Sequence, residues 1–157
     1  MMEDYLDSEH ARERILVIKL FPCLRMSLSK HATQKLIQLM WNDMNRSVRK
    51  CSAQTLGRTG RGQQVHDEIC IRLKSQNSFD RIEALNKLNH IGIMTNELLN
   101  HYLKCFYDDY ISVRELACIS AQSLFEKDEK VLGALVFMAR FDKIPKLKAL
   151  AIRSKYV

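Results

Sequence analysis

The segment Asp43-Met-Asn-Arg-Ser-Val-Arg-Lys-Cys-Ser-Ala-Gln-Thr-Leu-Gly-Arg-Thr-Gly60 decides the fold. It runs from an acidic residue through a Val-Arg pair and small residues to Leu-Gly and a closing glycine. The segment Asp108-Asp-Tyr-Ile-Ser-Val-Arg-Glu-Leu-Ala117 repeats its first half. Two copies of one pattern within 157 residues indicate an internal repeat, and a repeat predicts stacked units.

Apolar residues recur along the chain at a spacing of 33 residues. Within each unit they fall at i, i+4, i+5 and i+8, which places them on one face of an α-helix. The aligned series are Ala32, Val65, Leu98 and Val131; Leu36, Ile69, Tyr102 and Leu135; Ile37, Cys70, Leu103 and Val136; and Met40, Leu73, Phe106 and Ala139. One unit is too small to bury such a face alone, so we expect the units to stack.

Each unit is predicted to contain two helices, and no long run alternates as a β-strand would. The first helices are expected at Ser29–Asp43, Arg61–Ser75, Thr95–Asp109 and Asp128–Asp142. The second helices are expected at about Asn45–Arg58, Ser78–Ile91, Ser112–Glu126 and Pro145–Lys155. We therefore expect a single domain, 1–157, with a leading helix at about 8–21 and repeats at about 29–60, 61–92, 95–126 and 128–157.

Residues at these boundaries favour helix starts and stops. Ser112 and Glu115 have the spacing of a capping box, in which two side chains satisfy free amides at a helix start. Pro145 suits the first turn of the last helix, where its missing N–H matters least. Gly92 suits a helix end because glycine readily adopts the left-handed conformation. Pro22 suits the end of the leading helix.

Charged positions also recur in the second helices. The aligned basic residues are Arg49, Arg81, Arg114 and Lys148. An acidic residue stands six positions earlier in three units, as Asp43, Asp108 and Asp142. In the remaining unit this place is taken by Ser75.

With these residues the chain resembles the HEAT-repeat family. The turn Asp, the Val-Arg pair, the small residue after it and the Leu-Gly ending of residues 43–60 carry the resemblance, which extends over about residues 29–153. The spacing is below the roughly 40–47 residues of most HEAT and armadillo arrays, and it is similar to the short phycobilisome-lyase-like repeats. Ankyrin and tetratricopeptide repeats have similar periods, but their signature patterns are absent.

The resemblance implies an all-α fold, a right-handed α-α superhelix (a HEAT/armadillo-like solenoid) of about four helical hairpins plus the leading helix. First helices would line the convex side and second helices the concave side. It also implies a structural ladder between neighbouring units, made by Asp43, Arg49, Arg81, Asp108, Arg114, Asp142 and Lys148. Because Ser75 replaces an aspartate, the rung of Arg81 is left open. The pattern breaks off after Ala151, so we expect a fragment or short isoform of a longer array.

Composition and charge limit the class of protein. The formal net charge is +7, with an excess of basic residues at 44–74 and at 128–157. Five cysteines, mostly in apolar helical stripes, argue against a disulfide framework. The chain has no signal-peptide pattern and no apolar run near the roughly 20 residues that span a bilayer. We expect a cytoplasmic, intracellular protein that does not bind membranes.

Patterns for catalysis or metal binding are sparse. HEAT-like iron hydroxylases carry repeated His-Glu pairs, and no His-Glu dipeptide occurs here. The pairs His66 with Cys70 and His101 with Cys105 have i,i+4 spacing and are compatible with zinc, although Cys70 is also an aligned core position. No nucleophile–base pattern or phosphate-binding loop is present. We expect no enzyme activity, no cofactor and no metal.

The expected function is a non-enzymatic scaffold or adaptor that presents a concave helical surface to a protein partner. The candidate contact residues are Arg46, Lys50, Gln54, Glu83, Lys87 and Glu115. Trp41 and Tyr107 are interpreted as core or staple residues, with interface anchors as the alternative. The basic segments suit a solvated face, an acidic protein such as a tubulin tail, or nucleic acid through residues 44–74 and 128–157. The sequence leaves the oligomeric state open.

Overall fold

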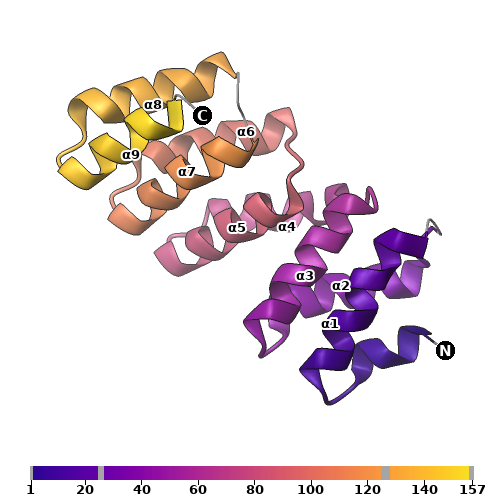
Figure 1. The fold of residues 1–157 in the computed structure, drawn as a ribbon. Coiled ribbons are helices and arrows are strands. Elements are labelled where there is room, and N and C mark those ends of the chain that lie inside the picture. The colour runs from indigo at the N-terminus through magenta and orange to yellow at the C-terminus, as the bar shows by residue number, and fades with distance from the viewer. Residues whose placement is uncertain (1, 25–26, 125–127, 156–157) are drawn as a thin grey trace. The chain divides into compact units, whose positions relative to one another are not determined.

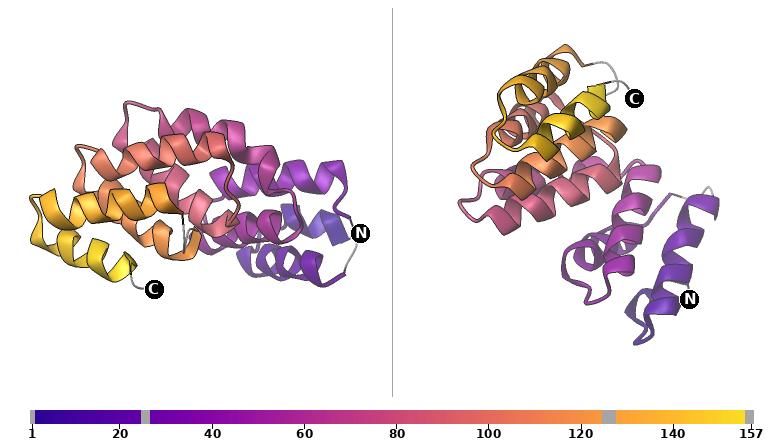
Figure 2. Two further views of the ribbon diagram at one scale, coloured as in Figure 1. Left: turned by 90° about the horizontal axis from the view of Figure 1, so that it is seen from above. Right: turned by 60° about the vertical axis from the view of Figure 1, so that its left-hand side comes forward.

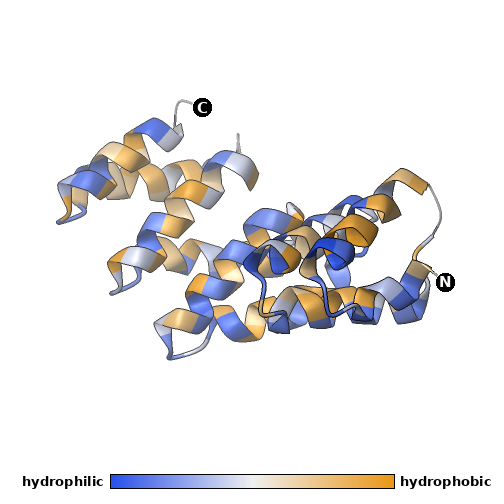
Figure 3. Cartoon of the chain, turned by 60° about the horizontal axis from the view of Figure 1, so that its bottom comes forward, coloured by the Kyte–Doolittle hydropathy of each residue, from blue (hydrophilic) through white to orange (hydrophobic). Residues whose placement is uncertain are grey.

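The computed structural model describes residues 2–24, 27–124 and 128–155, and every regular element in these ranges is a helix (Figure 1). The expected all-α class is confirmed. Packing divides the chain into two compact units, Met1–His66 and Asp67–Val157. Along the helices, hydrophobic and hydrophilic residues alternate as expected when one face is buried (Figure 3).

The first unit is built around α3. Its helices are η1 (Met2–Asp7), α1 (Ala11–Leu20), η2 (Phe21–Leu24), α2 (Lys30–Asn42), α3 (Arg46–Arg58) and η3 (Gly62–Val65). Helix α3 packs against both α1 and α2. The side chains of Leu6, Ile18, Leu36, Met40 and Leu56 are fully buried and form the core of this unit.

In the second unit, alternate helices along the chain lie side by side. The helices of this unit are α4 (His66–Leu73, which begins at the last residue of the first unit), α5 (Ser78–Ile91), α6 (Asn96–Lys104), η4 (Cys105–Tyr107), α7 (Ile111–Leu124), α8 (Glu129–Phe141) and α9 (Pro145–Lys155). Helix α7 packs between α5 and α9, and α8 packs on α9 (Figure 2). The buried Tyr102 ring meets Phe106 edge-on at 5.2 Å, and its hydroxyl donates to the carbonyl of Ala117 at 2.6 Å.

Short polar side chains start the helices where the sequence predicts. The side chains of Ser29, Asn45, Asn77, Thr95 and Asp128 each accept hydrogen bonds from backbone amides of the following first turn. Such caps satisfy amides that have no partner within the helix, and each typically contributes about 1 kcal/mol. At the other end of α5, Gly92 has φ +71° and its amide donates to the carbonyl of Leu88 at 3.0 Å, as expected for a glycine C-cap.

Three boundary predictions need correction. The capping box is wrong, because α7 begins at Ile111 and Ser112 therefore lies inside the helix. The first helix expected at Arg61–Ser75 starts as the 3₁₀-helix η3 and is α-helical only over α4. The one expected at Thr95–Asp109 changes to 3₁₀ geometry at Cys105. Residues 125–126 of the helix expected at Ser112–Glu126 lie outside the described residues.

The sequence predicts one continuous domain over residues 1–157, and within it the packing separates two compact units. The division into units falls between His66 and Asp67, near the start of α4. The repeat that begins there is the one whose turn has Ser75 in place of the acidic residue.

Candidate functional site

Arginine–aspartate pairs join α1, α5 and α7 to the turns that precede α3, α7 and α9, respectively. Arg14 donates from Nε and Nη2 to the two carboxylate oxygens of Asp43, at 2.9 and 3.1 Å. Arg81 contacts Asp108 in the same way at 2.7 and 2.9 Å. Arg114 contacts Asp142 at 2.8 and 3.3 Å. Each pair is a two-point contact, which is stronger and more directional than a single ionic contact.

The remaining nitrogen of each arginine binds the turn of its own unit. Nη1 donates to the main-chain carbonyl six residues earlier: Ser8 for Arg14, Ser75 for Arg81 and Asp108 for Arg114, at 2.5, 2.7 and 2.7 Å. An aspartate six residues before the arginine therefore offers its carbonyl. The carboxylate comes from the next unit, 27 to 29 residues later.

This geometry changes the assignment of the predicted ladder residues. Arg81 has a full carboxylate partner, because Ser75 needs to supply only its main-chain oxygen. Arg49 donates to the carbonyl of Asp43 at 2.7 Å and has no carboxylate partner among the described residues of its own unit. Arg14 belongs to the ladder but was missed, since its turn contains no acidic residue six positions earlier.

Lys148 makes no two-point contact with a carboxylate among the described residues, although its charge helps to lower the pKa of Asp142. Its Nζ donates to the carbonyl of Arg140 at 3.1 Å, near the end of α8. That carbonyl belongs to the last turn of a helix, where acceptors lack partners within the helix. A lysine ammonium lacks the planar guanidinium group with which an arginine contacts a carboxylate and main-chain carbonyls at the same time.

Burial makes the rungs electrostatically significant. The side chains of Asp142 and Arg114 are 4% and 14% exposed. Burial alone would raise the pKa of the Asp142 carboxyl, but the hydrogen bonds from Arg114 and from the Ile144 amide, with the charge of Arg114, outweigh it and hold the pKa below its usual value. The hydrogen bond to Asp108 raises the pKa of Arg81 above its usual value.

Helices α1 and α3 carry a basic surface of the first unit. Helix α3 carries four basic residues and no acidic one. Lys19, Gln54 and Arg58 line a surface pocket of about 380 Å³, together with Cys51 and Thr55. The two helices are joined beneath it by a hydrogen bond from the Thr55 hydroxyl to the carbonyl of Ile18 at 3.0 Å.

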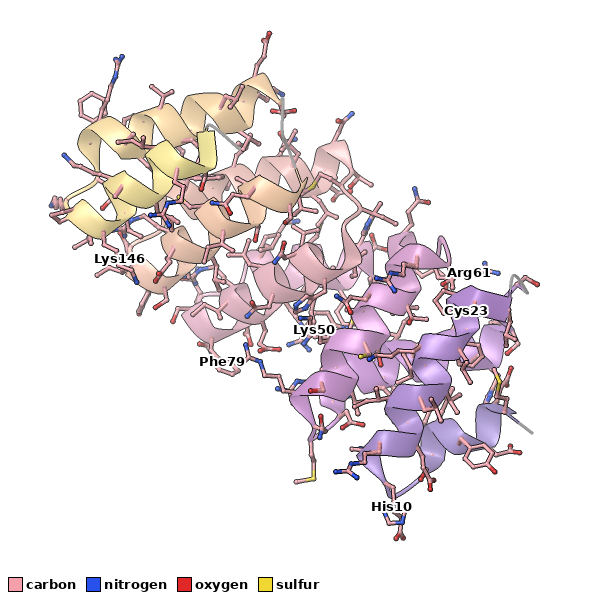
Figure 4. The ribbon with its side chains drawn as sticks, in the orientation of Figure 1. His10, Cys23, Lys50, Arg61, Phe79 and Lys146 are labelled. Carbon is pink, nitrogen blue, oxygen red and sulfur yellow. The ribbon has the colours of Figure 1, made fainter. Side chains whose placement is uncertain are left out.

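The basic residues on this surface do not take part in the Arg–Asp pairs. Lys19, Arg46, Lys50 and Arg58 are exposed, and none forms an ion pair with the described residues of the first unit. Figure 4 shows Lys50 on α3. We call these four residues, with Gln54, the basic face. No carboxylate among the described residues of the first unit neutralises its charge.

The six predicted contact residues therefore fall into two groups. Arg46, Lys50 and Gln54 lie on the basic face. Glu83, Lys87 and Glu115 lie in the second unit and are engaged there, since Lys87 contacts Glu83 at 3.3 Å and Lys146 contacts Glu115 at 2.6 Å.

Lys87 was expected to be exposed, and this is wrong because only 4% of it is accessible. It stands six residues after Arg81, and this repeat position is buried in the other units as well. The equivalent residues are Thr55, Ser120 and Ser154, exposed by 3%, 1% and 8%. The helical phase of the repeat therefore directs Lys87 inward.

The aromatic residues expected in the core behave differently from each other. Tyr107 is 55% exposed, so its assignment to the core is wrong, whereas Trp41 is partly buried. The Tyr107 ring packs on Phe137 at 5.1 Å, and Phe137 packs on Phe141 at 5.0 Å. These three exposed rings are among the residues that line a pocket of about 470 Å³ in the second unit.

The Cys105 thiol donates to the carbonyl of His101 at 3.6 Å, and burial raises the pKa of Cys105 to about 12. The structure places Cys70, Glu97 and His101 together, with one potential ligand atom from each within 4.8 Å of the others. Sequence reasoning missed Glu97, although its i,i+4 spacing from His101 put it on the same face of the helix.

No protein-family model matches the chain. Among the described residues, no helix combines the length and the apolar character that a membrane crossing requires.

Proposed function

We propose that this chain is a non-enzymatic binding module, a HEAT-like α-α superhelix whose second helices hold an acidic segment of a protein partner. Support for the superhelix comes from the repeated Arg–Asp rungs and from the side-by-side packing of α1 with α3 and of α5, α7 and α9. Regular nearest-neighbour contacts of this kind are what repeat arrays use to present an extended surface.

The proposal of an acidic partner rests on the unpaired charge of the basic face. Three other arginines, Arg14, Arg81 and Arg114, have their charge neutralised by buried aspartates. The cations of the basic face have no such partner among the described residues of their unit, and Lys19 and Arg58 line one pocket. A chain of carboxylates would supply the missing counter-charges and would be attracted from a distance.

The chemistry of the face favours an acidic protein over single-stranded nucleic acid. Single strands are usually held by aromatic rings that stack on the bases, between cations that contact the phosphates. Among the described residues of the first unit, the large exposed aromatic residue is Tyr5, which belongs to η1. Neither α1 nor α3 presents an exposed ring beside its cations.

The test is binding of a fluorescently labelled, glutamate-rich peptide to the full chain, measured by anisotropy. We expect binding to the wild type and its loss in Lys50→Glu/Arg58→Glu. The matched control is Lys30→Glu/Lys130→Glu, which changes the net charge equally at exposed sites on α2 and α8. Equal loss in both variants would contradict the proposal, because attraction would then depend on total charge alone.

A second arm uses duplex and single-stranded oligonucleotides at about 50 and 200 mM salt. Binding tighter than that of the peptide, with a steep fall at higher salt, would replace the protein partner by nucleic acid. Weak binding that the basic-face variant does not change would support the acidic-protein proposal.

A further inference from the structure

We propose that Cys70, Glu97 and His101 form a binding site for a divalent metal ion, and that zinc is the ion their chemistry fits. The site lies within the second unit and is independent of the basic face. Cys70 is on α4, and Glu97 and His101 are one turn apart on α6. A thiolate, a carboxylate and an imidazole are all established ligands of zinc.

The spacing of the three side chains suits a tetrahedral ion. The Cys70 sulfur, a Glu97 oxygen and an imidazole nitrogen of His101 all lie within 4.8 Å of one another. Bonds of about 2.0–2.3 Å in tetrahedral geometry separate ligand atoms by roughly 3.3–3.8 Å. The ligand atoms therefore need to approach by about 1.5 Å at most, and the exposed Glu97 can turn without disturbing the core.

The burial of the three ligands is graded from inside to outside. Cys70 is buried, His101 is partly exposed and Glu97 is exposed. An ion can therefore reach the site from solvent and be held against a sulfur that is shielded from water. Three protein ligands leave a fourth tetrahedral position for a water molecule.

Some charged neighbours of the site favour the binding of a cation, and others oppose it. Burial is the largest cause that raises the pKa of the Cys70 thiol, and the nearby carboxylates of Glu97 and Asp67 raise it further. These two carboxylates would also attract a cation. Burial lowers the pKa of His101, and Lys74 and Lys104 lower it further. As ligands, His101 would act as a neutral imidazole and Cys70 as a thiolate, whose proton would pass to solvent when the sulfur–zinc bond forms. Lys74 opposes the ion, so its charge limits the affinity.

The same three residue types also occur in enzymes with a cysteine nucleophile, but the surroundings here do not suit one. A nucleophilic cysteine is a thiolate with a lowered pKa. Burial raises the pKa of Cys70, and the nearby carboxylates add to this effect. A metal ion does not need a thiolate formed in advance, because it displaces the thiol proton as it binds.

A bound ion would join α4 to α6 and stabilise the second unit. Any ligand that binds only the folded state raises the free energy of unfolding as its concentration exceeds the dissociation constant. The structural consequence is a cross-link between the first helices of two successive repeats, made by side chains rather than by the core.

The experiment is titration of the full, reduced chain with Co²⁺, which reports a thiolate ligand through a sulfur-to-cobalt charge-transfer band, followed by displacement with Zn²⁺. We expect one equivalent to bind in the wild type. Cys70→Ser should lose the band, and Cys23→Ser, which removes an exposed thiol elsewhere, should keep it.

Two surface variants keep the test decisive if Cys70→Ser folds poorly. Glu97→Gln should weaken zinc binding by more than about tenfold, since loss of a ligand costs at least as much as loss of an outer-shell partner. Lys74→Gln should tighten it by about two- to tenfold by removing a repelling charge. Absence of the band in the wild type, its survival in folded Cys70→Ser, or unchanged affinity in Glu97→Gln would each overturn the proposal.

Discussion

The hydroxyl of Thr55 donates a hydrogen bond to the main-chain carbonyl of Ile18, 37 residues earlier. In an α-helix this carbonyl would accept from the amide of residue 22, which is Pro22 and has no N–H. Ser154 occupies the equivalent position in the last repeat and donates to the carbonyl of Cys118 at 3.1 Å. Hydroxyl groups therefore form a second set of links between neighbouring second helices, one to two turns away from the Arg–Asp rungs.

Thr55→Val should lower the free energy of unfolding by about 1–3 kcal/mol, because it leaves a buried carbonyl without its donor while the side-chain volume is kept. Thr55→Ser retains the hydroxyl and should recover most of the loss. Urea denaturation followed by circular dichroism measures both. Equal destabilisation by the two variants would show that the methyl group, rather than the hydrogen bond, matters.

Arg114→Ala should destabilise the second unit by about 2–4 kcal/mol, between the values for exposed and buried ion pairs. The loss has two parts, since Asp142 loses its partner and the carbonyl of Asp108 loses a donor. Arg114→Lys should recover only a part, because an ammonium cannot make the two-point contact. Arg153→Ala removes an exposed arginine of α9 and serves as the control, with an expected change within about 0.5 kcal/mol.

The Asp142 rung should make stability depend on acid. The folded-state pKa of Asp142 lies below its ordinary value of about 3.9, so its contribution is complete above that value. The contribution is lost as the pH falls from there through the folded-state pKa. Asp142→Asn should therefore be less stable than the wild type at neutral pH, and the difference should shrink at acidic pH. Thermal melts across this range measure it, and a constant difference would contradict the expectation.

Lys87→Glu and Lys50→Glu make the same charge change on two second helices and should differ strongly in stability. Reversal at the buried Lys87 places a carboxylate beside Glu83 and should cost about 3 kcal/mol, or about 10 °C in Tm. Reversal at the exposed Lys50 should leave Tm nearly unchanged and weaken peptide binding. Similar melting temperatures for the two variants would refute the inward orientation of Lys87.

Thiol reactivity should separate Cys23 from the buried cysteines. Cys23 is exposed, while burial raises the pKa of both Cys105 and Cys118 to about 12. A disulfide reagent should modify Cys23 quickly in the folded chain and reach the other two only after unfolding. Cys23→Ser should remove the fast phase, and a persistent fast phase would show that a buried thiol is accessible.

Local signals in the sequence predicted the helices well because each depends on neighbouring residues. Ser29, Thr95 and Asp128 cap the helices that they were expected to begin, and the predicted bounds Ser78–Ile91 and Pro145–Lys155 agree with the structure. The capping box failed because Asp108 accepts the amide of Tyr110 and turns the chain into α7 earlier. The burial of Lys87 was also foreseeable, since the repeat phase aligns it with Thr55 and Ser154.

Helix positions, the repeat period and the helical class follow from the residues alone, because capping and hydrophobic periodicity act over one or two turns. Only the tertiary structure decided that Arg14 pairs with Asp43, and that Cys70 meets Glu97 and His101. These contacts join residues about one repeat apart, and their geometry depends on how one helix is offset and rotated against the next. That offset is fixed by the fit of many side chains together, which no local pattern encodes.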